Sequence, residues 1–266
     1  ITAGYLYDQI GTGIIFRSYE ERALGIDNAI LGARLEYDVK GMLKLKAFAG
    51  AQKLKFSIQK PLILGFNAEG DFATKNNIIF KPGIGVINRS MDQDNINSVV
   101  ATIESYDTAG RFVPKYNTYA VTAYNTISGG GFTWYVEGAY KTTEAIKKDQ
   151  IRDAKDTLIN SAGNCVYSTL NYSQKGLGIT LQFKRTENFY LHTSPNPTEA
   201  LFDGMLNFLP PVSRQNSLRL PSRYFAPSLE NRELAFGAEI TYSPSRKMTF
   251  TAQGSYIRDF ILKKYN

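Results

Sequence analysis

Apolar and polar residues alternate one by one over much of this chain, which is the period of a β-strand with two different faces. In LGARLEYDV (31–39) the odd-numbered residues are apolar or aromatic, and the even-numbered ones are Gly, Arg, Glu and Asp. The same alternation recurs in LILGFNAEGDF (62–72), LGITLQFK (177–184), ELAFGAEITY (233–242) and MTFTAQGSY (248–256). Helical periodicity of comparable quality is found nowhere in the sequence, so the pattern predicts an all-β chain.

Short and long connections alternate between the expected strands. Residues typical of tight turns occur at 38–41, 74–77, 128–131, 173–176 and 243–246, and longer polar segments at 18–28, 53–60, 90–114, 146–163 and 191–231. An up-and-down sheet with this order has all its short turns on one rim, as outer-membrane barrels do. A soluble β-sandwich, the alternative, more often has shorter strands and Greek-key connections.

The fold class that we predict is therefore all-β: an antiparallel up-and-down transmembrane β-barrel. It forms a single domain over residues 1–266, with about twelve strands in this chain and room for more in the parent protein. Aromatic residues support the prediction, because many of them fall at expected strand ends, where two aromatic girdles would lie. These residues are Tyr7, Tyr37, Phe72, Tyr116, Tyr119, Tyr140, Tyr242 and Tyr256.

Composition narrows the function classes. The net charge is +7, but Lys and Arg are not gathered in any run, which argues against a nucleic-acid-binding surface. Cys165 is the only cysteine, so no internal disulfide can form. No apolar run approaches the length of about 18 residues that a membrane-spanning helix needs. The chain begins at Ile1 without a signal peptide, and we expect an excerpt of a longer chain or a processed one.

A dense charge cluster, RSYEERALGIDN (17–28), lies between two apolar strands on the long-loop rim. If this segment bends into the barrel, Arg17 and Arg22 could pair with Glu20, Glu21, Glu36 or Glu69 and plug the lumen. Glu36 and Glu69 are the best candidates among the carboxylates of the barrel wall. A solvated surface loop is the alternative. The expected charge cluster of the lumen comprises Arg17, Glu20, Glu21, Arg22, Asp27, Arg34, Glu36 and Glu69.

The stretch 5–37 resembles a signature of outer-membrane β-barrel proteins of Bacteroidota, a family without a settled activity. The resemblance is carried by Tyr7, Asp8, Gln9, Gly11, Gly13, Arg17, Tyr19, Glu20, Arg22, Gly25, Asp27, Asn28 and Gly32. Outer-membrane barrels commonly end on an aromatic residue, whereas this chain ends in Tyr265 and Asn266. Either the true C-terminus lies further on, or the insertion signal differs.

Candidate chemistry is sparse. His192 is the only histidine, and Pro195 and Pro197 separate it from Glu199, so a loop histidine is favoured over a catalytic base. Asp92 and Asp94 are weak candidates for a calcium site, because the loop lacks the Gly and Glu of an EF-hand, and a plain polar loop is favoured. The glycines at 129–131 indicate a hairpin.

An apolar island, EALFDGMLNFLPP (199–211), interrupts the last long loop. Thr198 could cap a short helix there and Pro210 would stop it. Its apolar residues would either dock against another protein or pack as a lid on the barrel mouth, and docking is favoured slightly. The expected partner-docking residues are Leu201, Phe202, Met205 and Phe208.

We therefore expect a non-enzymatic structural or accessory subunit of a larger complex in the bacterial outer membrane, with no cofactor. Its expected partners are outer-membrane lipid, lipopolysaccharide and other outer-membrane proteins or surface lipoproteins, but not nucleic acid. A passive channel, given a mild anion preference by Lys44 and Lys46, is the alternative. A hydrolase at the rim is a more distant one.

Overall fold

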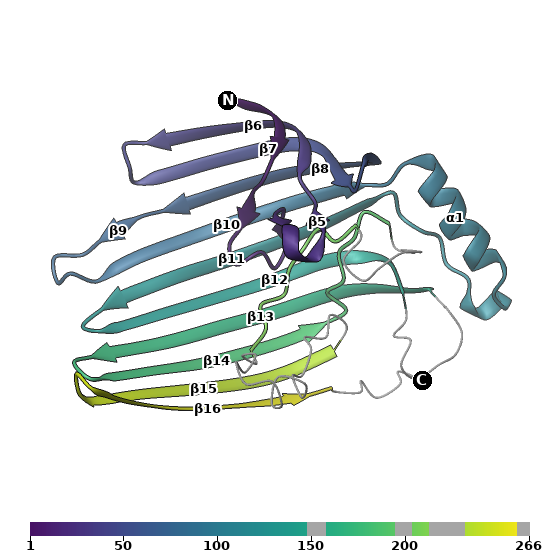
Figure 1. The fold of residues 1–266 in the computed structure, drawn as a ribbon. Coiled ribbons are helices and arrows are strands. Elements are labelled where there is room, and N and C mark those ends of the chain that lie inside the picture. Colours follow the sequence, from purple (N-terminus) through teal and green to yellow (C-terminus); the bar gives the residue numbers. More distant parts are fainter. Residues whose placement is uncertain (148–157, 195–203, 213–231, 260–266) are drawn as a thin grey trace.

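The computed structural model describes residues 1–147, 158–194, 204–212 and 232–259 of the chain. Its main element is a twelve-stranded sheet in which every pairing is antiparallel (Figure 1). Its strands are β1 (Thr2–Leu6), β6 (Ile30–Val39), β7 (Leu43–Leu54), β8 (Ser57–Gly70), β9 (Phe72–Ala73), β10 (Ile79–Ser90), β11 (Asn117–Gly129), β12 (Phe132–Lys147), β13 (Leu158–Gln174), β14 (Leu177–Glu187), β15 (Arg232–Ser245) and β16 (Met248–Arg258).

The strands follow one another across the sheet in chain order, with β9 paired only to β10. This confirms the predicted all-β, antiparallel, up-and-down arrangement. Within the described residues the sheet is open, because its end strands β1 and β16 are not hydrogen-bonded to each other. The chain as described is therefore a sheet and not a closed barrel.

Short turns gather on one rim, on the left of Figure 1, where β6–β7, β9–β10, β11–β12, β13–β14 and β15–β16 are joined. One predicted long connection is wrong: β7 and β8 run through residues 53–60 and are joined by Lys55 and Phe56 alone. The segment 146–163 is also partly strand, since β12 extends to Lys147 and β13 begins at Leu158.

The segment 90–114 contains a helix that the sequence reading did not predict, α1 (Gln93–Glu104), followed by the 3-10 turn η2 (Thr108–Gly110). Asp92 caps α1 by accepting a hydrogen bond from the Asp94 amide. Ile96, Val99 and Ile103 form its buried stripe. Only these few apolar residues mark the helical period among polar neighbours, so the sequence pattern favours a polar loop in this segment.

The two faces of the sheet differ sharply in what they bury. On the outer face, Leu35, Leu64 and Phe236 are 52%, 42% and 46% exposed. Phe250 is also exposed, and Phe183 is half-buried against Phe236, with ring centroids 5.1 Å apart. The eight aromatic residues expected at strand ends are all exposed. Large apolar side chains thus face away from the protein over most of the sheet.

Two segments cover the inner face (Figure 1). The first, residues 6–18, is called the plug; it contains the paired strands β2 (Gln9–Ile10) and β3 (Phe16–Arg17). The second, called the strap, comprises residues 188–194 and 204–212. Ile10, Ile14 and Phe16 of the plug are fully buried, and they share a core with strap and inner-face residues. The core of the protein therefore lies between the sheet and its own inner segments.

Candidate functional site: the charged inner face

Three buried charges meet on the inner face near the rim of long connections. Arg89 of β10 and Lys141 of β12 both pair with Glu144, and all three side chains are at most 4% exposed. The Lys141 Nζ to Glu144 Oε1 distance is 2.6 Å. A β-bulge between Lys141 and Glu144 brings both onto the same face, although they are three residues apart.

A second buried ion pair joins β14 and β15, which are neighbours in the sheet. The Nζ of Lys184 on β14 is 2.6 Å from Oε1 of Glu233 on β15, and both side chains are fully buried. Charges this deep are retained only where a partner compensates for their lost hydration. The inner face is therefore built for specific ionic contacts, not for general solvation.

The same cations hold the strap. Arg89 donates to the His192 carbonyl at 3.3 Å, Lys141 to the Tyr190 carbonyl at 2.7 Å and Lys184 to the Pro210 carbonyl at 3.0 Å. Three strands of the wall thus anchor one covering segment through charge-assisted hydrogen bonds to its backbone.

Glu137 of β12, also fully buried, anchors the plug. Its carboxylate accepts hydrogen bonds from the Thr12 amide at 2.9 Å and the Thr12 hydroxyl at 2.5 Å. The hydroxyls of Thr122 and Tyr135 also donate to it, at 2.9 and 2.6 Å. Gly11 makes this approach feasible: its φ is +55°, and a Cβ there would lie 2.5 Å from Glu137 Oε1.

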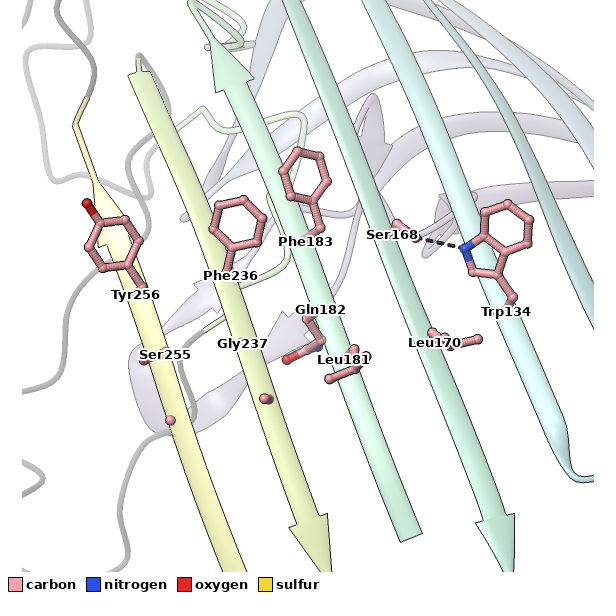
Figure 2. A pocket seen from close by; sticks show the side chains of 12 residues that line it. Trp134, Ser168, Leu170, Leu181, Gln182, Phe183, Phe236, Gly237, Ser255 and Tyr256 are labelled. Carbon is pink, nitrogen blue, oxygen red and sulfur yellow. Dashed lines mark hydrogen bonds between the residues drawn. The ribbon is translucent and has the colours of Figure 1, made fainter.

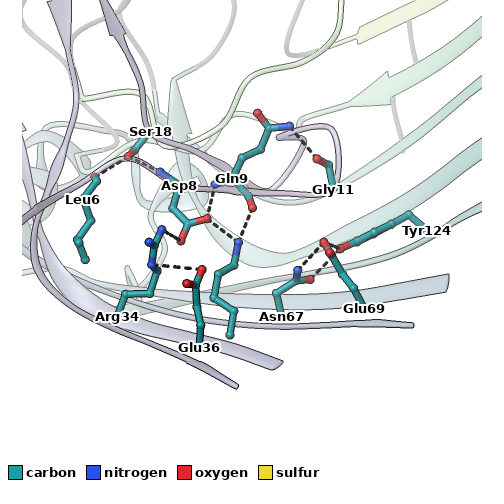
Figure 3. A network of polar contacts seen from close by, with 11 residues as sticks. Leu6, Asp8, Gln9, Gly11, Ser18, Arg34, Glu36, Asn67, Glu69 and Tyr124 are labelled. Atoms are coloured by element: carbon teal, nitrogen blue, oxygen red, sulfur yellow. Dashed lines mark hydrogen bonds and ion pairs between the residues drawn. The ribbon is translucent and has the colours of Figure 1, made fainter. Parts of the chain in front are cut away.

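Asp8 makes a third anchor, shown in Figure 3. It accepts from Arg34 at 3.2 Å and from Lys46 at 2.5 Å, and its side chain is 8% exposed. Arg34 also lies 3.4 Å from the largely exposed Glu36. Here the plug supplies the carboxylate and the sheet supplies the cations. The prediction had the charges the other way round, with cations on the inward segment and carboxylates on the sheet.

Glu69 does not contact the charge cluster of residues 17–28. It accepts hydrogen bonds from Tyr124 at 2.7 Å and Asn67 at 2.9 Å (Figure 3). Beside it a cavity of about 330 Å³ is lined by the plug residues Gln9, Gly11 and Thr12 and by Lys44 of β7.

Neither Arg17 nor Arg22 pairs with the wall carboxylates Glu36 and Glu69, and of the four predicted partners only Glu20 is found, beside Arg22. The Arg17 guanidinium lies over the rings of Tyr19 and Phe208, 4.8 and 4.6 Å from their centroids. Arg22 pairs with Glu20 at 3.0 Å, and its side chain is 87% exposed. The inward-folded plug overlaps this cluster only at Arg17 and Ser18, and Arg22 lies outside the plug.

Glu21 and Asp27, the remaining acids of the cluster, lie on the side of the long connections. Glu21 caps the 3-10 turn η1 (Arg22–Leu24), which joins β4 (Glu20–Glu21) to β5 (Ile26–Asp27). Asp27 pairs with Lys53 and accepts from the Tyr7 hydroxyl at 3.0 Å. Burial alone would raise the pKa of Asp27, but its hydrogen bonds to Lys53, Tyr7 and the Ala29 amide together lower that pKa.

The expected docking helix is absent from the described part of the loop. Leu201 and Phe202 lie outside the described residues, and residues 205–210 form no helix. Leu206 is buried in the core, and the Met205 carbonyl accepts from Gln52 at 2.6 Å. Phe208 packs on Arg17. Met205, Leu206 and Phe208 thus hold the strap to the plug and to the sheet, and they lie on the inner side of the protein.

His192, Asp92 and Asp94, the weaker candidates for chemistry, make packing, capping and ion-pair contacts within the fold. His192 is 2% exposed and stacks on Tyr190, with ring centroids 3.8 Å apart. Asp92 caps α1, and Asp94 pairs with Lys60. Among the described residues no group of three or more His, Cys, Asp or Glu side chains could hold a metal ion. In that same part of the chain, no helix is long and apolar enough to cross a membrane.

Sequence reasoning did not single out the most buried charges, which are Arg89, Glu137, Lys141, Glu144, Lys184 and Glu233. The alternation carried part of the signal, because Lys184 and Glu233 occupy polar positions of recognised strands. Pairing them requires the register across β14 and β15, which the alternation does not give.

The described residues thus define a class of protein: an open antiparallel β-sheet with an apolar outer face and a charged inner face covered by its own segments. A family model matches residues 1–258, and the chain belongs to that family, which is described as a family of unknown function (DUF6029). A search of curated proteins gives no match.

Proposed function

We propose that this protein is an integral β-barrel of a bacterial outer membrane and that the sheet forms the barrel wall. In this proposal it is a plugged, non-enzymatic structural or accessory subunit of a larger membrane complex. The rim of long connections, with α1 and the exposed charges of residues 20–27, faces the partner proteins.

The observation that carries the proposal is the inversion of the two faces. Exposed Leu, Ile, Phe, Tyr and Trp side chains cover the outer face, while ion pairs are buried on the inner one. Soluble monomers rarely expose apolar patches larger than a few hundred Å². Apolar-out and polar-in alternation is the pattern of a wall that faces lipid.

Closure of the barrel is part of the proposal. In the described residues β1 and β16 each have one neighbour in the sheet, and β16 is exposed along almost its whole length. An unpaired strand edge cannot be left in hydrocarbon, since its backbone groups would lack hydrogen-bond partners. In a membrane these edges must be joined to each other or to further strands.

The contacts of the plug and strap favour a closed, plugged barrel, and they argue against a passive channel. The two segments make hydrogen bonds to each other, such as Arg17 N to Leu206 O at 2.8 Å, as well as to the wall. One observation favours the passive channel: Lys44 lines two cavities, one of about 330 Å³ beside the plug and one of about 370 Å³ lined by residues of β6, β7 and β8. A channel would need the plug to leave.

Planar-bilayer conductance separates the two. We expect the wild-type protein to show no stable open step, because the plug is fixed by Glu137 and Asp8. Gly11→Ala should produce openings, since the added Cβ meets the Glu137 carboxylate. Gly178→Ala is the control, because a Cβ there meets nothing within 4 Å. Stable porin-sized steps from the wild-type protein would contradict the plugged state.

A further inference from the structure

A hollow crosses the outer face of the last strands, as Figure 2 shows. Its volume is about 660 Å³. One register line, running from β12 to β16, forms its length: Trp134, Leu170, Leu181, Ala238 and Gly254. The next line towards the long-connection rim brings the rings of Phe183, Phe236 and Tyr256 side by side.

Small residues make the hollow. Ala238 and Gly254 occupy the positions at which β12, β13 and β14 carry Trp134, Leu170 and Leu181. Because their side chains are small, the outer surface is lower there than on either side. A Cβ built on Gly254 would meet nothing within 4 Å. Its lining is mostly apolar, with Ser168, Gln182 and Ser255 as the polar residues, and its volume falls within the range of small-molecule sites.

Basic residues stand at the rim end of this groove. One register line beyond the aromatic row, Arg185 of β14 and Arg258 of β16 flank Leu234. Arg185 donates to Asn164 at 2.7 Å and pairs with Glu187 at 2.9 Å. Arg258 is exposed.

The neighbouring charges leave this end positive. Arg232 lies opposite Glu187 in the register and is 3.7 Å from Asp259. Among the described residues, three arginines (Arg185, Arg232 and Arg258) and two carboxylates (Glu187 and Asp259) lie at this end. Guanidinium groups bind phosphate oxygens through paired N–H donors, so a phosphate beside Arg258 would find charge and geometry that suit it.

We propose that this groove binds one membrane lipid of the anionic phospholipid class. An acyl chain lies between Trp134 and Tyr256, over Ala238 and Gly254, and the phosphate contacts Arg258 with support from Arg185. The inference rests on the proposed membrane location, and it adds a defined lipid site to a face that otherwise meets lipid in general.

Trp134 reports on the site directly, because it is the only tryptophan of the chain and lines the groove. The protein is placed in phosphatidylcholine nanodiscs with a small fraction of brominated lipid, which quenches tryptophan on contact. Brominated phosphatidylglycerol is compared with brominated phosphatidylcholine at the same fraction. We expect the brominated anionic lipid to reach the same quenching at about a fivefold lower fraction. This is the gain in affinity that one arginine near a membrane surface gives for an anionic lipid.

Two variants assign the effect. Arg258→Gln should abolish the preference for the anionic lipid while leaving general quenching intact. Gly254→Leu should fill the groove and remove the excess quenching. Gly138→Leu is the matched control: it adds the same side chain to another outer-face glycine with open space, outside the groove lining, and should behave as wild type.

The outcomes separate the two proposals. Equal quenching by both lipids would overturn the lipid site and leave the membrane location standing. A preference that survives in both Arg258→Gln and Gly254→Leu would also overturn it. Absence of quenching by either lipid would mean that Trp134 meets no acyl chain, and the proposed membrane wall would then fail as well.

Discussion

Single residues show how the inner face is held together. Lys184 and Glu233 are fully buried, and Lys184 also donates to the strap at Pro210. A charge in this position has no access to water, so each member of the pair depends on the other. The pair fixes the register of β14 against β15 and ties the strap to both.

Removing one partner should therefore be costly. We expect Lys184→Met to destabilise the protein by about 3–5 kcal/mol, because it removes the Lys184 ammonium from the buried Glu233 carboxylate. Urea unfolding in detergent micelles measures the change. Combining Lys184→Met with Glu233→Leu should restore most of the loss, and a double variant as unstable as the sum of both single ones would contradict coupling.

Asp27 should make the rim sensitive to acid. Its folded pKa is lowered, so its contribution is complete above the unfolded value of about 3.9 and disappears as the pH falls through the folded value. A spin label at the exposed Ala23 should become mobile only in strong acid. Asp27→Asn should make it mobile at neutral pH, and an unchanged titration in that variant would rule out this assignment.

At the residue scale, the sequence predicted which face of the sheet a side chain occupies better than it predicted which side chain it contacts. Alternation correctly indicated which residues of β6, β8 and β15 point outward. It could not predict that Arg17 would stack on Tyr19 and Phe208, because Phe208 lies far away in the chain. It also gave no reason to single out Asp8, whose cationic partners come from β6 and β7.

At the scale of elements, the plug and the segment that follows it should respond differently to protease. Arg22 is exposed on η1, whereas Arg17 is covered by Phe208 of the strap. Trypsin added to the folded protein should cut after Arg22 and spare Arg17. Mass spectrometry of the fragments identifies the sites.

Phe208→Ala provides the matched test of that protection. Without the ring, Arg17 loses one of its two aromatic contacts, and cleavage after Arg17 should appear while cleavage after Arg22 continues. Equal rates at both sites in the wild-type protein would show that the strap does not cover the plug.

Strands and glycine-containing turns were predictable, and two other connections were not. The β7–β8 turn places Lys55 at φ +55°, where Gly or Asn is the usual signal, so nothing in the sequence marks a tight hairpin there. Helix α1 carries only three buried residues in its twelve, too few to stand out from the polar loop around it.

For the whole molecule, the central claim is that the outer face meets lipid while the plug and strap form the core. The sequence predicted the sheet and its two rims. It did not predict that Phe48, Ile63 and Ile87 on the inner side would build a core with the plug, because this requires the plug to fold back over the sheet. Closure of the sheet depends on edges that remain unpaired in the described residues.

Accessibility along β8 tests that claim most directly. In a Cys165→Ser background, residues 62–67 are changed to cysteine one at a time, spin-labelled and reconstituted in vesicles. Positions 62, 64 and 66 should be reached by oxygen, which concentrates in the bilayer, while 63, 65 and 67 should be shielded from it. If 62, 64 and 66 were instead reached by a water-soluble relaxation agent, the outer face would be solvated, and the membrane wall would be contradicted.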